Sequence, residues 1–435
     1  MDQARRTAVL ALVRQEESGY ANLVLGSFLE QQTLSSRDKA FVSAVFYGVT
    51  ERLITLDWCL SRCLSRPLHK LDAQVRAILR SGLYQAAYMN IPPRAAVNES
   101  VNLCRGLKKT SASGLVNAVL RKAMEQDPRK AQFKTPAERL SVLYSVGQPI
   151  VKLLQKQYPQ ECECILQAFG NPPQHTLLRA NSLKVDVSEL CDRLAQQGTP
   201  AQPGPVPGSV QADFAGSPAA GEAFAQGLYH VQGAASQLAA LNLGTQPGQK
   251  VLDLCAAPGG KTLTLAQCMQ NTGTLISCDA VQSRLSLIEG ALSRCGIANT
   301  TVLCNDASVH NAQLEGADRV LCDVPCSGLG IIAKKPDIRY KTMEQVEQLH
   351  ALQAEILACG ASYLKSGGRL VYSTCTIDQR ENQQVVEAFL QIHPEFYLVE
   401  PEFTLPGARI HNHMMTFLPG ESGPDGFFIA VLEKA

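Results

Sequence analysis

The sequence predicts three domains: an all-helical front, a small α/β middle and a doubly wound α/β domain at the end. Its 435 residues correspond to about three domains of ~150 residues each. Through residues 1–145, apolar residues recur at three- and four-residue spacing, which is typical of helices. Beyond residue 236, short apolar runs alternate with amphipathic segments, which is typical of strands and helices in turn. Residues 146–235 are less regular and are assigned to the middle domain.

The front, residues 1–145, is expected to hold consecutive helices. Apolar positions in Phe41–Phe46 and Val75–Tyr84 keep helical spacing. The segment Asn90–Pro93 predicts the end of one helix and the start of another, because proline suits a first helical turn. A further helix is predicted from Leu115 and ends near Asp127.

The middle, residues 146–235, is expected to be a small α/β domain. A strand is predicted from Thr176 and a short helix over Val187–Gln197. Ten of the 24 residues from Gly198 to Gly221 are glycine or proline, which predicts a surface loop. A helix at Ala234–Leu243 leads into the last domain.

The last domain, residues 236–435, is predicted to contain a parallel, doubly wound sheet. Strands that are buried on both faces and joined by helices form such sheets. The predicted strands are Val251–Cys255, Thr274–Cys278, Thr301–Cys304, Val320–Asp323, Arg369–Ser373 and Gly426–Leu432. The predicted helices are Thr262–Met269, Arg284–Cys295, Glu344–Leu364 and Glu381–Leu390.

Composition excludes a disordered chain, because 45% of the residues are hydrophobic and 18% are charged. The formal net charge of +1 hides an asymmetry. Residues 1–150 carry 21 Lys or Arg and 12 Asp or Glu, whereas residues 151–435 carry 19 Lys or Arg and 27 Asp or Glu. The basic front indicates an anionic partner. A helical domain with solvated basic side chains would have the same charge, and charge alone does not separate the two interpretations.

The fifteen cysteines do not indicate a disulfide framework, because their number is odd and most lie in apolar runs. No CxxC pair occurs, and Cys162 and Cys164 are too close together for a zinc site, so no metal is expected. The apolar run near the start is too short for a signal peptide, and no run of ~20 apolar residues could span a membrane. A reducing cytoplasm, without membrane contact, is therefore expected.

The first chemical motif is Asp253-Leu-Cys-Ala-Ala-Pro-Gly-Gly-Lys-Thr262, in which a glycine turn joins a buried strand to a helix. Such turns bring free N–H groups close to a ligand. A P-loop for a nucleotide phosphate is a near match, but its first glycine would fall on Cys255. A nucleoside cofactor fits better, because such sites place an acidic residue about 20 residues after the glycines, where Asp279 lies. Asp306 ends the third strand, and carboxylates at successive strand ends would repel a triphosphate.

Two further cysteines follow the next strands in loops of small or polar residues: Cys326 in Asp323-Val-Pro-Cys-Ser-Gly and Cys375 in Ser373-Thr-Cys-Thr. A reactive thiol must be accessible and able to ionise. A thiolate that adds to carbon 6 of a pyrimidine makes carbon 5 able to take a methyl group from an adenosyl cofactor. Asp323 is placed to assist at the N3 and N4 edge of the base, which must leave its helix to be reached. Small buried side chains are expected at other thiols, namely Cys255, Cys278, Cys304, Cys322 and Cys359.

These motifs resemble those of the Nop/Sun family of RNA cytosine-5 methyltransferases. The resemblance lies in Asp253–Thr262, in Asp323–Gly330, and in Tyr372–Thr376 followed by Glu381-Asn382. Other similar segments are Arg179–Lys184, Gly227–Gln237, Lys335–Arg339 and Leu418–Phe428. The similarity covers most of residues 175–435 and implies a Rossmann-like class I methyltransferase domain. The front, through Gly114–Arg121, resembles the NusB-like RNA-binding domain that precedes the catalytic part in the bacterial ribosomal RNA members of this family.

The resemblance implies methylation of carbon 5 of a specific cytosine in small-subunit (16S) ribosomal RNA, with S-adenosylmethionine as methyl donor. It implies that Cys375 is the nucleophile and that Cys326 helps to release the product, whereas DNA cytosine-5 enzymes use the Pro-Cys thiol as nucleophile. The cofactor positions that it implies are Cys255, Ala256, Ala257, Pro258, Gly259, Gly260, Lys261, Asp279, Arg284, Asp306 and Asp323. The RNA contacts expected from the similar segments are Arg179, Asn181, Lys334, Lys335 and Arg339.

The sequence departs from the family pattern at Ala333-Lys334-Lys335, where an Arg/His-rich run is usual, and at Thr376, where serine is common. A cytoplasmic monomer that acts on ribosomal RNA is expected. Two other functions stay open: a P-loop NTPase that uses Lys261 for phosphates and Asp323 for magnesium, and a ribosome-assembly binder without catalysis. Candidate phosphate contacts in the front are Arg5, Arg6, Arg76, Arg80, Arg105, Lys108, Lys109, Arg121 and Lys122.

Overall fold

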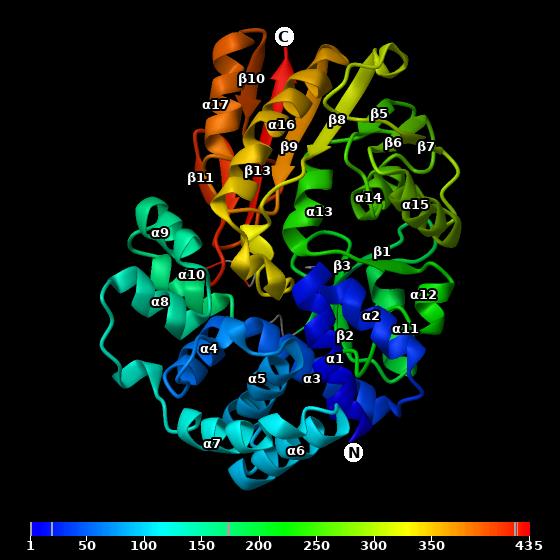
Figure 1. The fold of residues 1–435 in the computed structure, drawn as a ribbon. Helices are drawn as coiled ribbons and strands as arrows, with labels where there is room; N and C mark the ends of the chain where they lie inside the picture. Colours follow the sequence, from blue (N-terminus) through cyan, green and yellow to red (C-terminus); the bar gives the residue numbers. More distant parts are fainter. Residues whose placement is uncertain (1, 19–20, 172–174, 422, 424) are drawn as a thin grey trace. The chain divides into compact units, whose positions relative to one another are not determined.

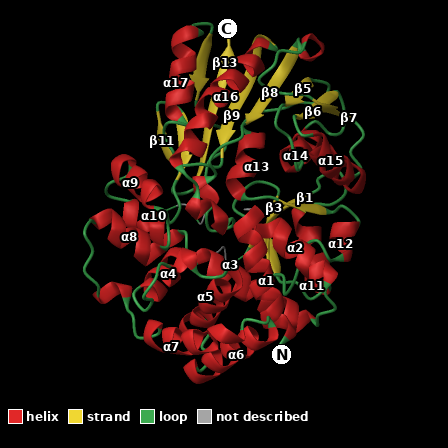
Figure 2. Ribbon diagram, in the orientation of Figure 1, coloured by secondary structure: helices red, strands yellow, loops and turns green. Residues whose placement is uncertain are grey.

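The computed structural model describes residues 2–18, 21–171, 175–421, 423 and 425–435. The chain divides into two compact units. The helical unit comprises Met1–Gly170 and Lys334–Met343, and the α/β unit comprises Asn171–Ala333 and Glu344–Ala435. Figure 1 labels their elements, and Figure 2 distinguishes the helices from the strands. The predicted combination of an all-helical front with a later α/β part is confirmed.

The helical unit is built from α-helices joined by short turns. The helices are α1 (Gln3–Ser18), α2 (Ala21–Gln31), α3 (Ser36–Glu51), α4 (Leu53–Ser61), α5 (Ala73–Tyr88), α6 (Pro93–Gly106), α7 (Ser113–Ala123), α8 (Pro136–Tyr144), α9 (Gln148–Gln157) and α10 (Cys162–Ala168). The short 3₁₀ helices are η1 (Leu68–Lys70), η2 (Thr110–Ala112), η3 (Pro128–Lys130) and η6 (Pro336–Tyr340). Within the described part of the chain, no helix is long and apolar enough to cross a membrane.

Helix starts in this unit follow the signals in the sequence. Pro93 occupies the first turn of α6, as predicted. At the start of α5, the Asp72 carboxylate accepts hydrogen bonds from the N–H groups of Gln74 and Val75, which have no partner within the helix. The apolar faces that these helices present pack into one core, which includes Phe46 and Ile78.

A buried cation lies beside this core. The Arg80 guanidinium, on α5, donates to both oxygens of Asp57 on α4, at 2.6 and 2.7 Å. It also forms an ion pair with Glu16 on α1. Glu16 forms a second ion pair with Arg76. Arg80 is only 8% exposed, so removing either carboxylate would leave its charge poorly compensated. This network ties three helices together.

The α/β unit begins with a small antiparallel sheet in the order β2-β3-β1-β4. Its strands are β1 (Thr176–Ala180), β2 (Ala201–Pro203), β3 (Ser209–Ala212) and β4 (Tyr229–Val231), with helices α11 (Val187–Gln196), α12 (Glu222–Ala225) and α13 (Ala234–Leu241). Residues 198–221 are therefore not only a loop, because β2 and β3 pair within them despite the glycines and prolines. The helical unit continues to Gly170, so the predicted middle domain, 146–235, is divided between the two units.

The large sheet has the order β11-β12-β13-β9-β8-β5-β6-β7, with β10 also paired to β13. Strands β5 to β9 are parallel, as predicted, whereas β10 to β13 are antiparallel to their neighbours, so the sheet is mixed at this edge. The strands are β5 (Lys250–Asp253), β6 (Thr274–Asp279), β7 (Thr300–Cys304), β8 (Ala317–Asp323), β9 (Leu364–Thr374), β10 (Phe396–Val399), β11 (Arg409–His411), β12 (Met414–Phe417) and β13 (Phe427–Lys434).

Successive residues of the central strands point to opposite faces and bury against different helices. Leu252 and Leu370 pack with one cluster that contains residues of α16 (Met343–Ser362) and α17 (Gln383–Ile392). Val251 and Val371 pack with another that contains residues of α13 and α14 (Gly260–Cys268). Figure 1 shows α16 and α17 along β9 and β13. The predicted double winding is confirmed, and the remaining elements are α15 (Gln282–Cys295), η4 (Ala312–Leu314) and η5 (Leu329–Ile331).

Candidate active site

The predicted site residues gather at the carboxyl ends of the parallel strands. Asp253, Asp279 and Asp323 are the last residues of β5, β6 and β8, and Thr374 is the last of β9. Parallel strands bring their carboxyl ends to one edge of a sheet, where α/β proteins bind ligands. The strand order β9-β8-β5-β6 makes these four ends neighbours.

The glycine turn between β5 and α14 is held by the next strand end. The N–H of Ala257 donates to Asp279 Oδ2 at 3.3 Å, and the Arg284 guanidinium donates to the Ala257 carbonyl at 2.8 Å. Arg284 also forms an ion pair with Asp279 at 3.2 Å. Gly259 has φ +101°, which a residue with a side chain rarely adopts, and a Cβ there would lie 3.4 Å from the backbone of Ile288. The predicted cofactor residues on these segments are therefore adjacent.

Asp253 is a fully buried carboxylate with one unsatisfied oxygen. Thr262 donates to its Oδ2 at 2.7 Å, whereas Oδ1 has no hydrogen-bond partner within the described residues. Burial raises the pKa of Asp253 to about 7, although the Thr262 bond and the Lys261 charge oppose the rise. A buried polar oxygen without a partner costs free energy, so it is a candidate acceptor for a ligand.

Lys261 and Ser373 hold Asp323 from two sides. The Lys261 ammonium donates to Asp323 Oδ2 at 2.6 Å, and the Ser373 hydroxyl donates to Oδ1 at 2.7 Å. Burial alone would lower the pKa of Lys261, but the Asp323 carboxylate raises it. Asp306, beyond β7, is exposed, and the hydrogen bond from the Ser308 hydroxyl lowers its pKa. The site thus combines a fixed ion pair with a solvated carboxylate.

The two thiols of the predicted catalytic pair lie side by side. Cys326 Sγ and Cys375 Sγ are 3.2 Å apart, in the loops that follow β8 and β9. The hydrogen bond with Cys375, followed by burial, raises the pKa of Cys326 well above its usual value. Cys326 therefore keeps its proton near neutral pH while Cys375 is beside it. The backbone N–H of Gly330 donates to the Cys375 carbonyl at 3.0 Å, which joins the two loops.

Glu381 links the two loops that carry the thiols by accepting hydrogen bonds from both of them. The sequence motifs did not indicate this linking role. Its carboxylate accepts from the Ser327 N–H at 2.8 Å and from the Ser327 hydroxyl in the Cys326 loop. It also accepts from Thr376 in the Cys375 loop at 3.3 Å and from Gln353 at 2.9 Å. The sequence signal is Glu381-Asn382 itself, but its partners lie 5 to 54 residues away in the chain.

The cysteines assigned to structural roles mostly fit that role. Cys278, Cys322 and Cys359 are buried, and burial raises the pKa of Cys278 to about 12. Cys255 is half-buried at the glycine turn. Cys304 is exposed at the end of β7, so the expectation that it is buried is wrong. None of the fifteen cysteines, which all lie within the described residues, forms a disulfide.

Three of the expected RNA contacts are buried and hold backbone groups instead. Arg179 donates to the Pro207 carbonyl at 3.1 Å, and Asn181 donates to the carbonyls of Gly227 and Cys295 at 2.8 and 2.9 Å. Arg339 is 2% exposed and lies in the helical unit. Direct contact of these side chains with RNA is therefore not supported. The other two are exposed, namely Lys334 and Lys335.

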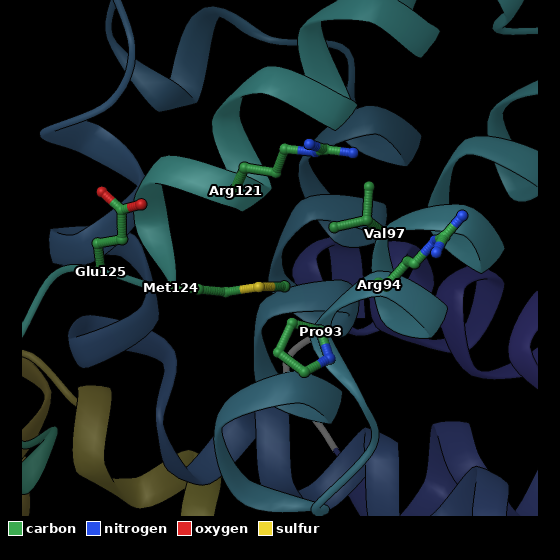
Figure 3. A pocket seen from close by; sticks show the side chains of 6 residues that line it. All are labelled: Pro93, Arg94, Val97, Arg121, Met124 and Glu125. Carbon is green, nitrogen blue, oxygen red and sulfur yellow. The ribbon is translucent and has the colours of Figure 1, made fainter.

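Figure 3 shows a pocket within the helical unit, between α6 and α7. Its lining residues are Pro93, Arg94, Val97, Arg121, Met124 and Glu125. The side chains of Arg94 and Arg121 are exposed and form no ion pair with any described residue. By contrast, Arg5, Arg76, Arg80 and Lys109, four of the predicted phosphate contacts, pair with carboxylates of the same unit.

Three separate family models match three successive segments of the chain. The 16S rRNA methyltransferase RsmB/F model matches residues 240–433, the NusB family matches residues 2–125, and an RsmF/B-like ferredoxin-like domain matches residues 148–212. The crystal structure of PH0851 has a TM-score of 0.85 with 26% identity and covers 99% of this chain and 98% of its own. NSun6 from Pyrococcus horikoshii, solved with SFG, has a TM-score of 0.61 with 22% identity and covers 67% of this chain and 99% of its own, which indicates the fold alone.

Curated relatives match along the whole sequence. The probable ribosomal RNA small subunit methyltransferase B of Bacillus subtilis (strain 168) is 34% identical and covers 99% of this chain and 98% of its own. The ribosomal RNA small subunit methyltransferase B of Escherichia coli O1:K1 / APEC is 34% identical and covers 93% of this chain and 92% of its own. The chain therefore belongs to the ribosomal RNA small subunit methyltransferase B family.

Proposed function

We propose that this protein methylates carbon 5 of a cytosine in small-subunit ribosomal RNA, through a covalent bond between Cys375 and carbon 6. The observation that carries the proposal is the thiol pair, Cys326 and Cys375, 3.2 Å apart beside the glycine turn in a chain of this family. Covalent catalysis by a thiol explains why two partly exposed cysteines lie at adjacent strand ends.

S-adenosylmethionine fits the residues of the glycine turn, and it would supply an electrophilic methyl group. The unsatisfied Oδ1 of Asp253 offers a buried acceptor for the ammonium of its amino acid part. The exposed carboxylate of Asp306 is available for hydroxyl groups. The N–H groups of Ala256, Ala257 and Gly259 in this turn are already paired, so the remaining candidates are the backbone N–H groups at the start of α14. The 16S rRNA methyltransferase RsmB/F model, which matches residues 240–433, supports a methyl donor of this class.

The thiols and Asp323 divide the chemistry of the base. The Cys375 sulfur adds to carbon 6, and the electron pair of the ring double bond moves to carbon 5, which takes the methyl group. A water or hydroxide base then takes the carbon 5 proton, the electron pair of that C–H bond re-forms the ring double bond, and the Cys375 sulfur leaves as a thiolate. Cys326 keeps its proton and lies 3.2 Å from that sulfur, so it is suited to donate a hydrogen bond to the leaving thiolate rather than to attack. Asp323, fixed by Lys261 and Ser373, is suited to the N3 and N4 edge of the base.

The alternative of a P-loop NTPase has less support. Its lysine would have to reach phosphates, but Lys261 is bound to Asp323 at 2.6 Å. Asp253, Asp279 and Asp323 would also repel a triphosphate. A binder without catalysis does not account for the paired thiols.

The helical unit is proposed to bind the ribosomal RNA backbone. Arg94 and Arg121 flank the pocket of Figure 3, whose apolar part is formed by Pro93, Val97 and Met124. Exposed guanidinium groups without carboxylate partners are suited to phosphates. The protein is proposed to act in the cytoplasm, where ribosomal RNA is assembled, and as a monomer.

Replacement of each thiol tests the mechanism. Ribosomal RNA from cells that carry only Cys375→Ala is expected to lack the 5-methylcytosine that bisulfite mapping finds with the unaltered protein. Cys326→Ala is expected to accumulate a covalent protein–RNA adduct that withstands denaturing gels, because release is slowed. The matched control is Cys304→Ala, an exposed thiol at another strand end, which should leave methylation unchanged. Methylation by Cys375→Ala at the unaltered rate would show that this thiol is not the nucleophile.

A further inference from the structure

Ten residues that follow the Cys326 loop fold as part of the helical unit. We call this segment, Lys334–Met343, the strap. Ala333 before it and Glu344 after it both belong to the α/β unit. The chain thus leaves the α/β unit after Ala333 and packs among the helices of the other unit. It returns to the α/β unit at Glu344, the second residue of α16.

Arg339 fastens the strap to the ends of three helices. Its guanidinium donates to the carbonyl of Tyr144, the last residue of α8, at 3.2 Å, and to that of Phe169, which caps α10. Its own carbonyl accepts from the N–H of Gly147, which caps α9, at 2.8 Å. Carbonyls at helix ends lack partners within the helix and carry partial negative charge, so they suit a buried guanidinium. A Cβ on Gly147 would lie 3.1 Å from the Arg339 carbonyl oxygen, so glycine permits this close approach.

Tyr340 fastens the next residue of the strap to the junction of α3 and α4. Its hydroxyl donates to the Thr50 carbonyl and accepts from the Leu53 N–H at 3.2 Å. The Ser145 hydroxyl lies 3.2 Å from the same oxygen. These contacts and those of Arg339 are all internal to the helical unit. The strap is therefore attached to α3, α4, α8, α9 and α10.

The chain on each side of the strap holds the thiol pair. On the amino side, the N–H of Gly330 donates to the Cys375 carbonyl at 3.0 Å. On the carboxyl side, Gln353 of α16 donates to the Pro325 carbonyl at 2.9 Å and to Glu381 at 2.9 Å. Both bonds act on the loops that carry the thiols. A strap fixed at one place restricts the conformations of both flanking segments.

We propose that the helical unit, through the strap, positions the Cys326 loop, so that Arg339 and Tyr340 are positioning residues for the reaction. Small displacements of a reacting group have large effects on rate. The proposal rests on the proposed function only where a methylation rate is measured. It gives the helical unit a second task beside RNA binding.

Insertion of Gly-Ser-Gly-Ser between Ala333 and Lys334 in the full chain tests this, because it keeps every side chain and loosens only the covalent link. We expect kcat to fall by about 10-fold or more, with KM for ribosomal RNA and for S-adenosylmethionine unchanged within about twofold. Cross-linking of Cys326 to Cys375 by dibromobimane, read by peptide mapping, should slow in parallel. The same insertion after Gly216, in an exposed turn of the α/β unit, is the control and should change neither rate.

Tyr340→Phe is a second variant, which removes only the hydroxyl and keeps the ring. We expect a smaller fall in kcat, about 3-fold, again with KM unchanged. An unchanged kcat and cross-linking rate in the insertion at residue 333 would overturn the proposal. A rise in KM for ribosomal RNA alone would also overturn it, because the strap would then serve RNA binding. If the unaltered protein methylates no ribosomal RNA, the proposed function fails, and the cross-linking rate alone still decides the role of the strap.

Discussion

Arg80 in the helical unit and Asp253 in the α/β unit are both buried, but their charges are satisfied differently. In the helical unit, Arg80 is surrounded by the carboxylates of Asp57 and Glu16, so its charge is neutralised where it lies. In the α/β unit, Asp253 and Glu381 are buried against neutral donors, and Asp253 keeps one oxygen without a partner among the described residues. Arg80, paired with carboxylates, serves the fold. A buried carboxylate held only by neutral donors costs stability and is retained where it serves a site.

The largest expected effect is on the folding of the helical unit. Arg80→Ala leaves Asp57 without its cation and Glu16 with only Arg76, and should lower the free energy of unfolding by about 3–5 kcal/mol. Trp58, the single tryptophan, lies in α4 and makes urea unfolding of this unit visible by fluorescence. Calorimetric affinity for S-adenosylmethionine should not change. Arg14→Ala, which breaks the exposed pair with Glu17, is the control and should cost less than about 1 kcal/mol. A loss of cofactor affinity in Arg80→Ala would contradict the division between the units.

The second effect is a pH dependence in the α/β unit. The pKa of Asp253 is raised to about 7 in the folded protein, so between its unfolded value and pH 7 the folded state binds more protons than the unfolded state. Stability should therefore fall as pH rises toward 7 and level off above it, by about 1.4 kcal/mol for each pH unit.

Asp253→Asn removes this titration. Urea unfolding is followed by circular dichroism at pH 5, 6, 7 and 8. The free energy of unfolding of the variant, relative to that of the unaltered protein, should increase with pH by about 3 kcal/mol in total. The same variant should bind S-adenosylmethionine more weakly, because the proposed acceptor is changed. Parallel pH curves for the two proteins would show that Asp253 does not titrate in this range.

The smallest effect concerns exposed charge on the helical unit. Arg94→Ala and Arg121→Ala should each weaken binding of a small-subunit ribosomal RNA fragment by several-fold and reduce the salt slope by about 1. Fluorescence anisotropy at several salt concentrations measures both. Arg37→Ala removes one exposed charge from the same unit outside the pocket and is the matched control. Equal losses in all three variants would mean that net charge, rather than the pocket of Figure 3, attracts RNA.

Local sequence patterns predicted what depends on neighbours in the chain. The alternation of apolar runs and helices placed Asp253, Asp279 and Asp323 at adjacent strand ends, because parallel strands share one carboxyl edge. The same alternation brought Cys326 and Cys375 together. The short strands β10, β11 and β12 were missed, because strands of three or four residues leave little periodic signal.

Partnerships across long separations left no such signal. The sequence does not show whether an arginine binds a phosphate or a backbone carbonyl. Arg179 and Arg339 were therefore expected to contact RNA, although both are buried. Gln353 binds Glu381 across 28 residues, and no spacing rule connects them. Only the folded arrangement separates such roles.

The strap also imposes an order on the making of the protein. The helices of the first 170 residues are synthesised early, but Arg339 and Tyr340, which bind their ends, emerge only after most of the α/β unit. Until then the carbonyls of Tyr144 and Phe169 lack their guanidinium partner. Completion of the first-made unit is thereby tied to synthesis of the Cys326 loop, so a nascent chain that stops before residue 334 holds neither a finished helical unit nor a complete set of thiols.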